Sequence, residues 1–206
     1  MAGEVIDPSL RKVRRLARDP SEILRERFER LEETDQKLFQ TGPLVLGVNS
    51  SFCGLIANNY LRRALNLTQA RLMSAVPMAV LPFMSTCLVY EAVVSQPLME
   101  GDLNCATCAF VRGGLIGAVV GCLYPAFIAI PLNAALADRY LSAPLPSKEN
   151  MLRYWLAVSK PVYKKLRFAA ILQFALGTYL ASKQHGIYIK MLQLPDPGRD
   201  PEEFSE

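Results

Sequence analysis

The chain has 206 residues, of which 51% are hydrophobic and 20% are charged, and its formal net charge is +4. The charges are segregated: residues 1–37 hold 18 of the 42 charged side chains (23 basic and 19 acidic in all), and residues 38–147 hold only nine. A water-soluble domain would place charges every few positions along its exposed faces. The segregation therefore excludes an ordinary soluble domain and predicts a membrane protein. Nucleic acid is not an expected partner, because the net charge is small and no basic face interleaved with aromatic residues stands out.

Residues 1–41 are expected to form a charged, partly helical N-terminal arm. From Pro20 onward, oppositely charged side chains lie three or four residues apart, as in the pairs Glu22–Arg25, Glu26–Arg30 and Glu33–Lys37. Apolar residues accompany them and predict an amphipathic helix: Ile23, Leu24, Phe28, Leu31 and Leu38. Such a helix is either a solvated arm or a segment that docks on a partner or a membrane surface. No secretory signal peptide is expected, and the acidic residues disfavour a cleavable mitochondrial presequence.

Residues 42–193 are expected to form an all-α, multi-pass membrane domain with about four transmembrane helices. A helix needs roughly 20 apolar residues to cross a bilayer, and the spans are expected at about 43–61, 72–95, 113–136 and 166–183. The fourth includes an uncharged stretch of only 15 residues, Phe168–Ser182. Flanking lysine and arginine side chains can snorkel and so extend it, and a re-entrant or surface helix is the alternative. The tail, residues 194–206, is expected to be disordered.

The first expected span carries small and polar residues, among them Asn49, Gly54 and Asn58. Polar groups within a bilayer must find partners inside the protein, so this face should pack against other helices. A short loop that begins at Arg62 leads to the second span, which contains two prolines. Glu91, near its far end, is expected at the membrane interface, and a buried ion pair or a role in proton transfer is the alternative.

Gly113, Gly117 and Gly121 form two consecutive GxxxG steps in the third expected span. Small residues at this spacing allow two helix backbones to approach closely. The pattern does not distinguish packing within this chain from packing against a partner. After this span, residues 138–167 are expected to form a polar loop with one short helix.

Cys105 and Cys108 form a Cys-x-x-Cys motif in the expected loop between the second and third spans. This motif can serve in redox exchange, as half of a zinc site or as a disulfide. Zinc needs four ligands, and the single histidine, His185, lies far along the chain, where it is expected at the surface. A candidate disulfide or two free thiols remain. No catalytic, cofactor or metal site is expected, because the chain has no glycine-rich phosphate loop and no Ser–His–acid arrangement.

The distribution of lysine and arginine predicts an orientation in the membrane. With four crossings, the loops 62–71 and 138–167 share one side and carry ten basic residues. The positive-inside rule places these loops on the inner side and both termini outside.

Several segments in combination resemble the transmembrane protein 126 family, over about residues 42–194. The matching segments are Gly47-Val-Asn49, Cys53-Gly-Leu-Ile-Ala-Asn58, Leu61-Arg62-Arg63, Pro77-Met-Ala, Pro82-Phe83, Gly101-Asp-Leu-Asn-Cys105 through Cys108, Gly121-Cys-Leu-Tyr-Pro125, Ala129-Ile-Pro131 and Ser159-Lys-Pro-Val162. The Cys-x-x-Cys loop is more similar to the A-type members than to the B-type members. Residues 1–40 depart from the family pattern, so nothing is carried over to them.

The resemblance implies a multi-pass protein of the mitochondrial inner membrane that acts as an assembly factor, or chaperone, for the membrane arm of respiratory complex I (NADH dehydrogenase). The implied partners are membrane-arm subunits and other assembly factors, with an Oxa-type insertase as a further candidate, besides membrane lipid. No cofactor is implied, and the chain is not expected to be an enzyme. Helix-packing faces would bind the hydrophobic subunits. Two alternatives stay open: a small inner-membrane transporter or channel, and a membrane thiol-redox protein that uses Cys105 and Cys108.

Overall fold

The computed structural model describes residues 20–140 and 150–195. Within these ranges every regular element is a helix and none is a strand, which confirms the all-α prediction. The elements are α2 (Pro20–Glu29), α3 (Glu33–Ala64), α4 (Arg71–Tyr90), η1 (Glu91–Ser95), α5 (Gln96–Glu100), α6 (Ala106–Leu115), η2 (Ile116–Leu123), α7 (Tyr124–Arg139) and α8 (Met151–Gln193).

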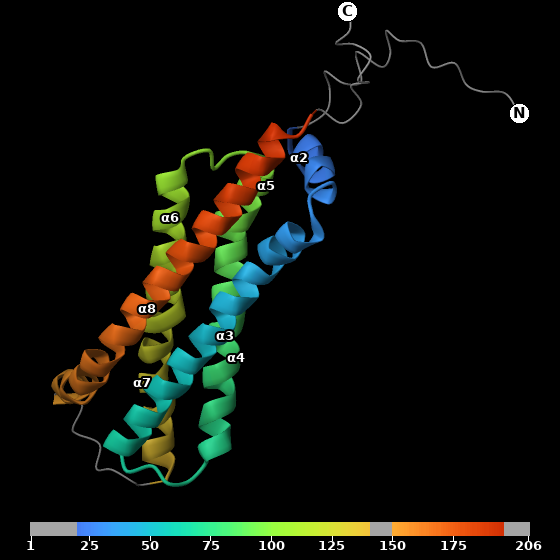
Figure 1. The fold of residues 1–206 in the computed structure, drawn as a ribbon. Helices are drawn as coiled ribbons and strands as arrows, with labels where there is room; N and C mark the ends of the chain where they lie inside the picture. The colour runs from blue at the N-terminus through green and yellow to red at the C-terminus, as the bar shows by residue number, and fades with distance from the viewer. Residues whose placement is uncertain (1–19, 141–149, 196–206) are drawn as a thin grey trace, which may run out of the picture.

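The described residues form four long helices, which run alternately up and down in a bundle (Figure 1). The elements α4, η1 and α5 form one continuous helix, and α6, η2 and α7 form another. In Figure 1, α3 and α8 lie side by side and cross in front of these two composite helices. The bundle brings residues that are distant in sequence, such as Asn49 and Gln173, into contact along its centre.

Two of the described helices are long and apolar enough to cross a membrane, namely Arg71–Glu100 and Ala106–Arg139. The helices α3 and α8 are long enough but too polar to meet the same criterion. The count of about four crossings therefore stays a prediction. From residue 196 on, the predicted disordered tail lies outside the described residues.

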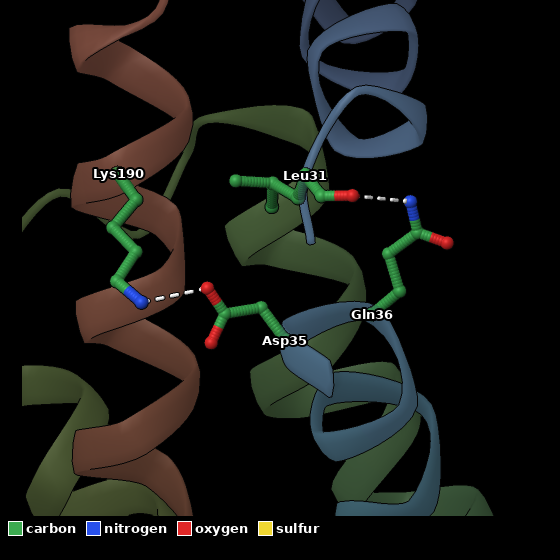
Figure 2. Close-up of polar contacts among 4 residues, drawn as sticks. All are labelled: Leu31, Asp35, Gln36 and Lys190. Atoms are coloured by element: carbon green, nitrogen blue, oxygen red, sulfur yellow. Dashed lines mark hydrogen bonds and ion pairs between the residues drawn. The ribbon is translucent and has the colours of Figure 1, made fainter. Parts of the chain in front are cut away.

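The predicted helix at the start of the chain is divided in two. α2 ends at Glu29, and α3 begins at Glu33 and continues without interruption through residue 41 into the first expected span. The Gln36 side chain stabilises the break, because its Nε2 donates to the backbone oxygens of Phe28 and Leu31 at 3.1 and 3.0 Å (Figure 2). This bonding supplies donors to carbonyl groups that the end of α2 leaves without helical partners.

An ion pair fastens the same region to the last helix. Figure 2 shows Lys190 of α8 pointing toward Asp35 of α3, with Nζ and Oδ2 2.6 Å apart. The Asp35 side chain is only 17% exposed, so this pair is less screened by solvent than an ordinary surface pair. It joins the two ends of the described chain at one end of the bundle.

Both composite helices contain a π-helical segment, and each segment ends two residues before a proline. η1 ends at Ser95, before Pro97, and η2 ends at Leu123, before Pro125. Proline removes one backbone donor and clashes with the carbonyl four residues earlier, and a wider turn relieves that clash. The carbonyl of Val93, four residues before Pro97, accepts instead from Nη1 of Arg112 at 3.4 Å.

The prediction of a polar loop with one short helix before residue 167 is wrong for the residues that the structure describes. From Met151, α8 is one helix of 43 residues that continues through Pro161. The reason is tertiary packing: Val162 and Leu166 are 4% and 1% exposed and belong to a buried cluster with residues of α3 and α7. This packing outweighs the local cost of a proline within a helix.

Arg62 closes the hairpin between α3 and α4. Its guanidinium is buried and donates to the carbonyls of Leu67 and Gln69, at 3.0 and 2.6 Å, and to the hydroxyl of Ser74, at 2.9 Å. The Arg62 side chain therefore provides hydrogen-bond donors to backbone carbonyls of the turn and links the turn to the first turn of α4. Hydrogen bonds from a charged donor are stronger than those between neutral groups.

Arg62→Met is expected to lower the free energy of unfolding by about 1–3 kcal/mol, since buried carbonyl groups lose their donor. The measurement is thermal unfolding of the full chain in detergent micelles. Arg63→Met is the matched control, because Arg63 is adjacent but exposed. Equal midpoints for the two variants would contradict the role assigned to Arg62.

Candidate functional site

The glycine face of the third expected span is packed against α8. A Cβ atom on Gly117 would lie 2.3 Å from the backbone oxygen of Gln173, and one on Gly113 would lie 2.6 Å from that of Gly177. Gly177 itself has no room for a side chain, because its Cβ would lie 2.2 Å from the oxygen of Gly113. Gly121, farther along, faces the Gln173 side chain. In this structure the two GxxxG steps therefore serve contact within the chain.

The small and polar residues of the first expected span are divided among three neighbouring helices. Asn49 donates to Oε1 of Gln173 in α8 at 2.9 Å. A Cβ atom on Gly54 would lie 2.3 Å from the oxygen of Met78 in α4. Asn58 donates to Ser74 Oγ in α4 at 3.1 Å and accepts from the Asn133 side chain in α7 at 2.7 Å. This face of α3 holds the bundle together from inside.

Two glutamines of α8 belong to this polar interior and were missed from the sequence. Gln173 and Gln184 are each 1% exposed. Gln184 donates to the backbone oxygen of Phe39 at 2.8 Å and to the Ser95 hydroxyl at 3.2 Å. The two glutamines are eleven residues apart, which is close to three helical turns. That spacing places them on one face and was the signal that could have identified them.

His185 was expected at the surface, and this prediction is wrong. The side chain is 8% exposed. Its ring packs against the rings of Phe110 and Tyr188, with centroid separations of 6.1 and 5.9 Å. Because α8 continues to Gln193, past the expected end of the fourth span at residue 183, His185 falls on its buried face.

Cys105 and Cys108 lie at the start of a helix, not in a loop. Cys105 is the N-cap of α6, and its sulfur accepts from the backbone N–H of Cys108 at 3.4 Å. The pKa of the Cys105 thiol is lowered because the side chain and the backbone N–H of Cys108 both hydrogen-bond its sulfur. Both side chains are exposed, and neither forms a disulfide in this structure. Whether they form one stays a prediction.

The two ends of the bundle differ in charge. Among the described residues, the end formed by residues 62–71, 138–140 and 150–167 carries nine basic side chains and one acidic side chain, Asp138. The opposite end, formed by residues 20–40, 91–112 and 183–195, carries nine acidic and seven basic side chains. That acidic end contains a cavity of about 1070 Å³ between α2, α3, η1 and α5. Five carboxylates line it: Glu22, Glu29, Glu91, Glu100 and Asp102.

Apart from the Cys105–Cys108 pair, the residues described above contribute helix packing and charge. No group of three or more His, Cys, Asp or Glu side chains in the described ranges could hold a metal ion. The buried polar side chains described here include Arg62 and His185 but no carboxylate. The polar contacts that are present join the chain's own helices.

Gly117→Ala is expected to destabilise the protein by about 1–3 kcal/mol, because the added methyl group must separate η2 from α8. The measurement is thermal unfolding of the full chain in detergent. Gly186→Ala is the matched control in α8, since a Cβ atom there meets nothing within 4 Å, and it should be neutral or slightly stabilising. Equal destabilisation by both variants would overturn the close contact between η2 and α8.

Comparison with known proteins identifies the family. A family model described as transmembrane protein 126 matches residues 18–198. The chain is 50% identical to "Transmembrane protein 126A" of Mus musculus over 175 residues (85% of this chain and 89% of the relative), and 48% identical to that of Homo sapiens over 174 residues (84% and 89%). It is 29% identical to "Complex I assembly factor TMEM126B, mitochondrial" of Mus musculus over 167 residues, or 81% of this chain and 72% of the relative. No solved structure matches. The resemblance found in the sequence is thus confirmed, and the chain belongs to the transmembrane protein 126 family.

Proposed function

We propose that this protein is an assembly factor for the membrane arm of mitochondrial complex I and that it resides in the inner membrane as a multi-pass protein. The observation that carries the proposal is membership of a family in which the TMEM126B relatives are named mitochondrial complex I assembly factors. The structure is compatible with this role, because the described helices expose apolar side chains such as Phe168 and Ile171. Its partners would be hydrophobic membrane-arm subunits and other assembly factors, among which an Oxa-type insertase remains a candidate.

The surface proposed for subunit binding is the exposed face of α8. The glycine face that the sequence suggested is filled by α8 itself, so a subunit would have to displace a helix to reach it. On the outer side of α8, Phe168 and Ile171 are 74% and 66% exposed. Their uncharged stretch has only 15 residues, which is short for a bilayer crossing. A partner helix that packs against Phe168 and Ile171 would cover this exposed apolar surface.

The count of lysine and arginine supports the predicted orientation, since the described residues place nine of them at the basic end and seven at the opposite end. The positive-inside rule places the basic end, with the 62–71 turn and the first half of α8, on the matrix side. The acidic end, with the cavity and Cys105, would then face the intermembrane space. Both termini of the chain would lie on that side.

The combined substitution of Phe168 and Ile171 by alanine is expected to reduce recovery of complex I membrane-arm intermediates in affinity pulldowns, because the proposed contact loses its apolar side chains. Pulldowns from mitochondria, followed by native gels and mass spectrometry of the bound subunits, measure this. Phe127→Ala is the matched control, since Phe127 is 67% exposed on α7. The glycine variants are unsuitable here because they should disturb the fold itself.

Three outcomes are informative. Loss of recovery with the α8 variant alone supports the proposed surface. Equal loss with Phe127→Ala would indicate a general effect of exposed aromatic residues and would overturn the assignment to α8. Absence of complex I subunits from pulldowns of the unmodified protein would overturn the proposed function.

A membrane-impermeant maleimide is expected to label Cys105 and Cys108 in reductant-treated mitoplasts whose inner membrane is intact, because the acidic end should face outward. Peptide mass spectrometry identifies the labelled residues. The buried Cys53 and Cys122 serve as internal controls and should be labelled only after denaturation. Labelling of Cys105 only after the inner membrane is opened would reverse the proposed orientation.

A further inference from the structure

The Cys105–Cys108 pair plays no part in the proposed packing function. Both thiols are free and exposed, whereas Cys53 and Cys122 are buried in the bundle and Cys87 is half-buried. No third metal-binding side chain joins the pair among the described residues, so the part of the chain that the structure describes gives no support for a zinc site. An exposed pair of thiols three residues apart is therefore available for thiol–disulfide exchange.

The local backbone activates the first thiol of the pair. Cys105 has an extended backbone (ψ 115°) just before α6, which directs its sulfur back to the N–H of Cys108 at 3.4 Å. Thiolates are stabilised at helix N-termini, and Cys105 is the N-cap residue of α6, where its sulfur accepts the N–H of Cys108. The two thiols therefore differ: Cys105 is the better nucleophile, and Cys108 lies next to it in position to react second.

The residues just before the motif are fixed. Leu103 is 3% exposed and belongs to the buried cluster at this end of the bundle. Asn104 accepts a hydrogen bond from the Tyr188 hydroxyl of α8. The segment before the motif is therefore held in position by these contacts, and the two thiols are exposed to solvent in a fixed location.

We propose that Cys105 and Cys108 form a reversible dithiol–disulfide site that exchanges with a disulfide, either glutathione disulfide or an exposed disulfide of a partner protein. The Cys105 thiolate attacks one sulfur of the incoming disulfide, forms a mixed disulfide and releases one thiolate. Cys108 then loses its proton and attacks the Cys105 sulfur, which closes the intramolecular bond and releases the second thiolate. The pair is oxidised by two electrons, the incoming disulfide is reduced to two thiols, and the released thiolates take up the two protons.

The same geometry makes the disulfide easy to reduce. In the reduced form the Cys105 sulfur caps the Cys108 N–H. Closure of the disulfide turns this sulfur toward the Cys108 sulfur, so the reduced form keeps a stabilising interaction that the oxidised form loses. Stabilisation of the reduced form makes a pair more oxidising than an ordinary structural disulfide.

The test uses the purified full-length protein in detergent, equilibrated with mixtures of reduced and oxidised glutathione. Differential alkylation and mass spectrometry then count free thiols at each cysteine. The expected result is that Cys105 and Cys108 lose both thiols together as the oxidised fraction rises, and recover both when reductant is restored. Cys108→Ser should accumulate a mixed disulfide on Cys105, and Cys105→Ser should accumulate much less on Cys108. Cys87→Ser is the control and should leave the transition unchanged.

The mass of the adduct trapped by Cys108→Ser in mitochondria distinguishes the two sources, since glutathione and a partner protein differ in mass. The proposal is overturned if both thiols remain free across the whole series, or if the pair binds zinc stoichiometrically. It is also overturned if oxidation is not reversed by reductant. The assay needs no complex I subunit, so its outcome is independent of the proposed assembly function.

Discussion

The contact between α8 and the α6–η2 helix is the constraint on which the bundle depends. Where Gly113 faces Gly177, and Gly117 faces the backbone of Gln173, no side chain separates the two helices. Such close approach is available only to glycine, and it maximises van der Waals contact where apolar lipid gives little drive for helix association. The contact also brings Gln173 close enough for Asn49 to reach it. This close contact at the glycines therefore positions α8 against both the α6–η2 helix and α3.

The sequence alone was sufficient for the all-α class and for the family, and it singled out the glycine spacing as a packing feature. These conclusions depend on local features, namely the absence of charge over long stretches and a regular repeat. What the glycines pack against could not be predicted, because Gly177 and Gln173 lie far away in sequence and neither forms a motif by itself. The length of α8 was missed for a related reason. Pro161 and the nearby lysines have the composition of a loop, and only the buried positions of Val162 and Leu166 show that packing overrides it.

The placement of the candidate residues was harder to predict than their identity. Asn49, Gly54 and Asn58 were identified because small and polar residues in apolar stretches indicate helix packing. The two asparagines have hydrogen-bond partners, and Gly54 lies close to the backbone of Met78. Their partners come from three different helices, which a single sequence cannot reveal. The Cys-x-x-Cys motif was identified but expected in a loop, since no residue pattern marks the start of α6 other than Cys105 itself. The position of His185 was predicted wrongly because the last helix was predicted to end too early in the sequence.

The two π-helical segments affect which neighbours each composite helix can reach. A π turn contains one residue more than the surrounding α-helix needs, so the contact face downstream of it is rotated. Upstream of η2, α6 packs mainly on α8, whereas downstream α7 packs mainly on α3 and α4. One continuous rod thus presents its apolar stripe first to one neighbour and then to another. Removing a single residue within residues 116–123 would restore an even helical repeat and turn the far half of the rod away from α3, so the length of this segment is under as much constraint as its composition.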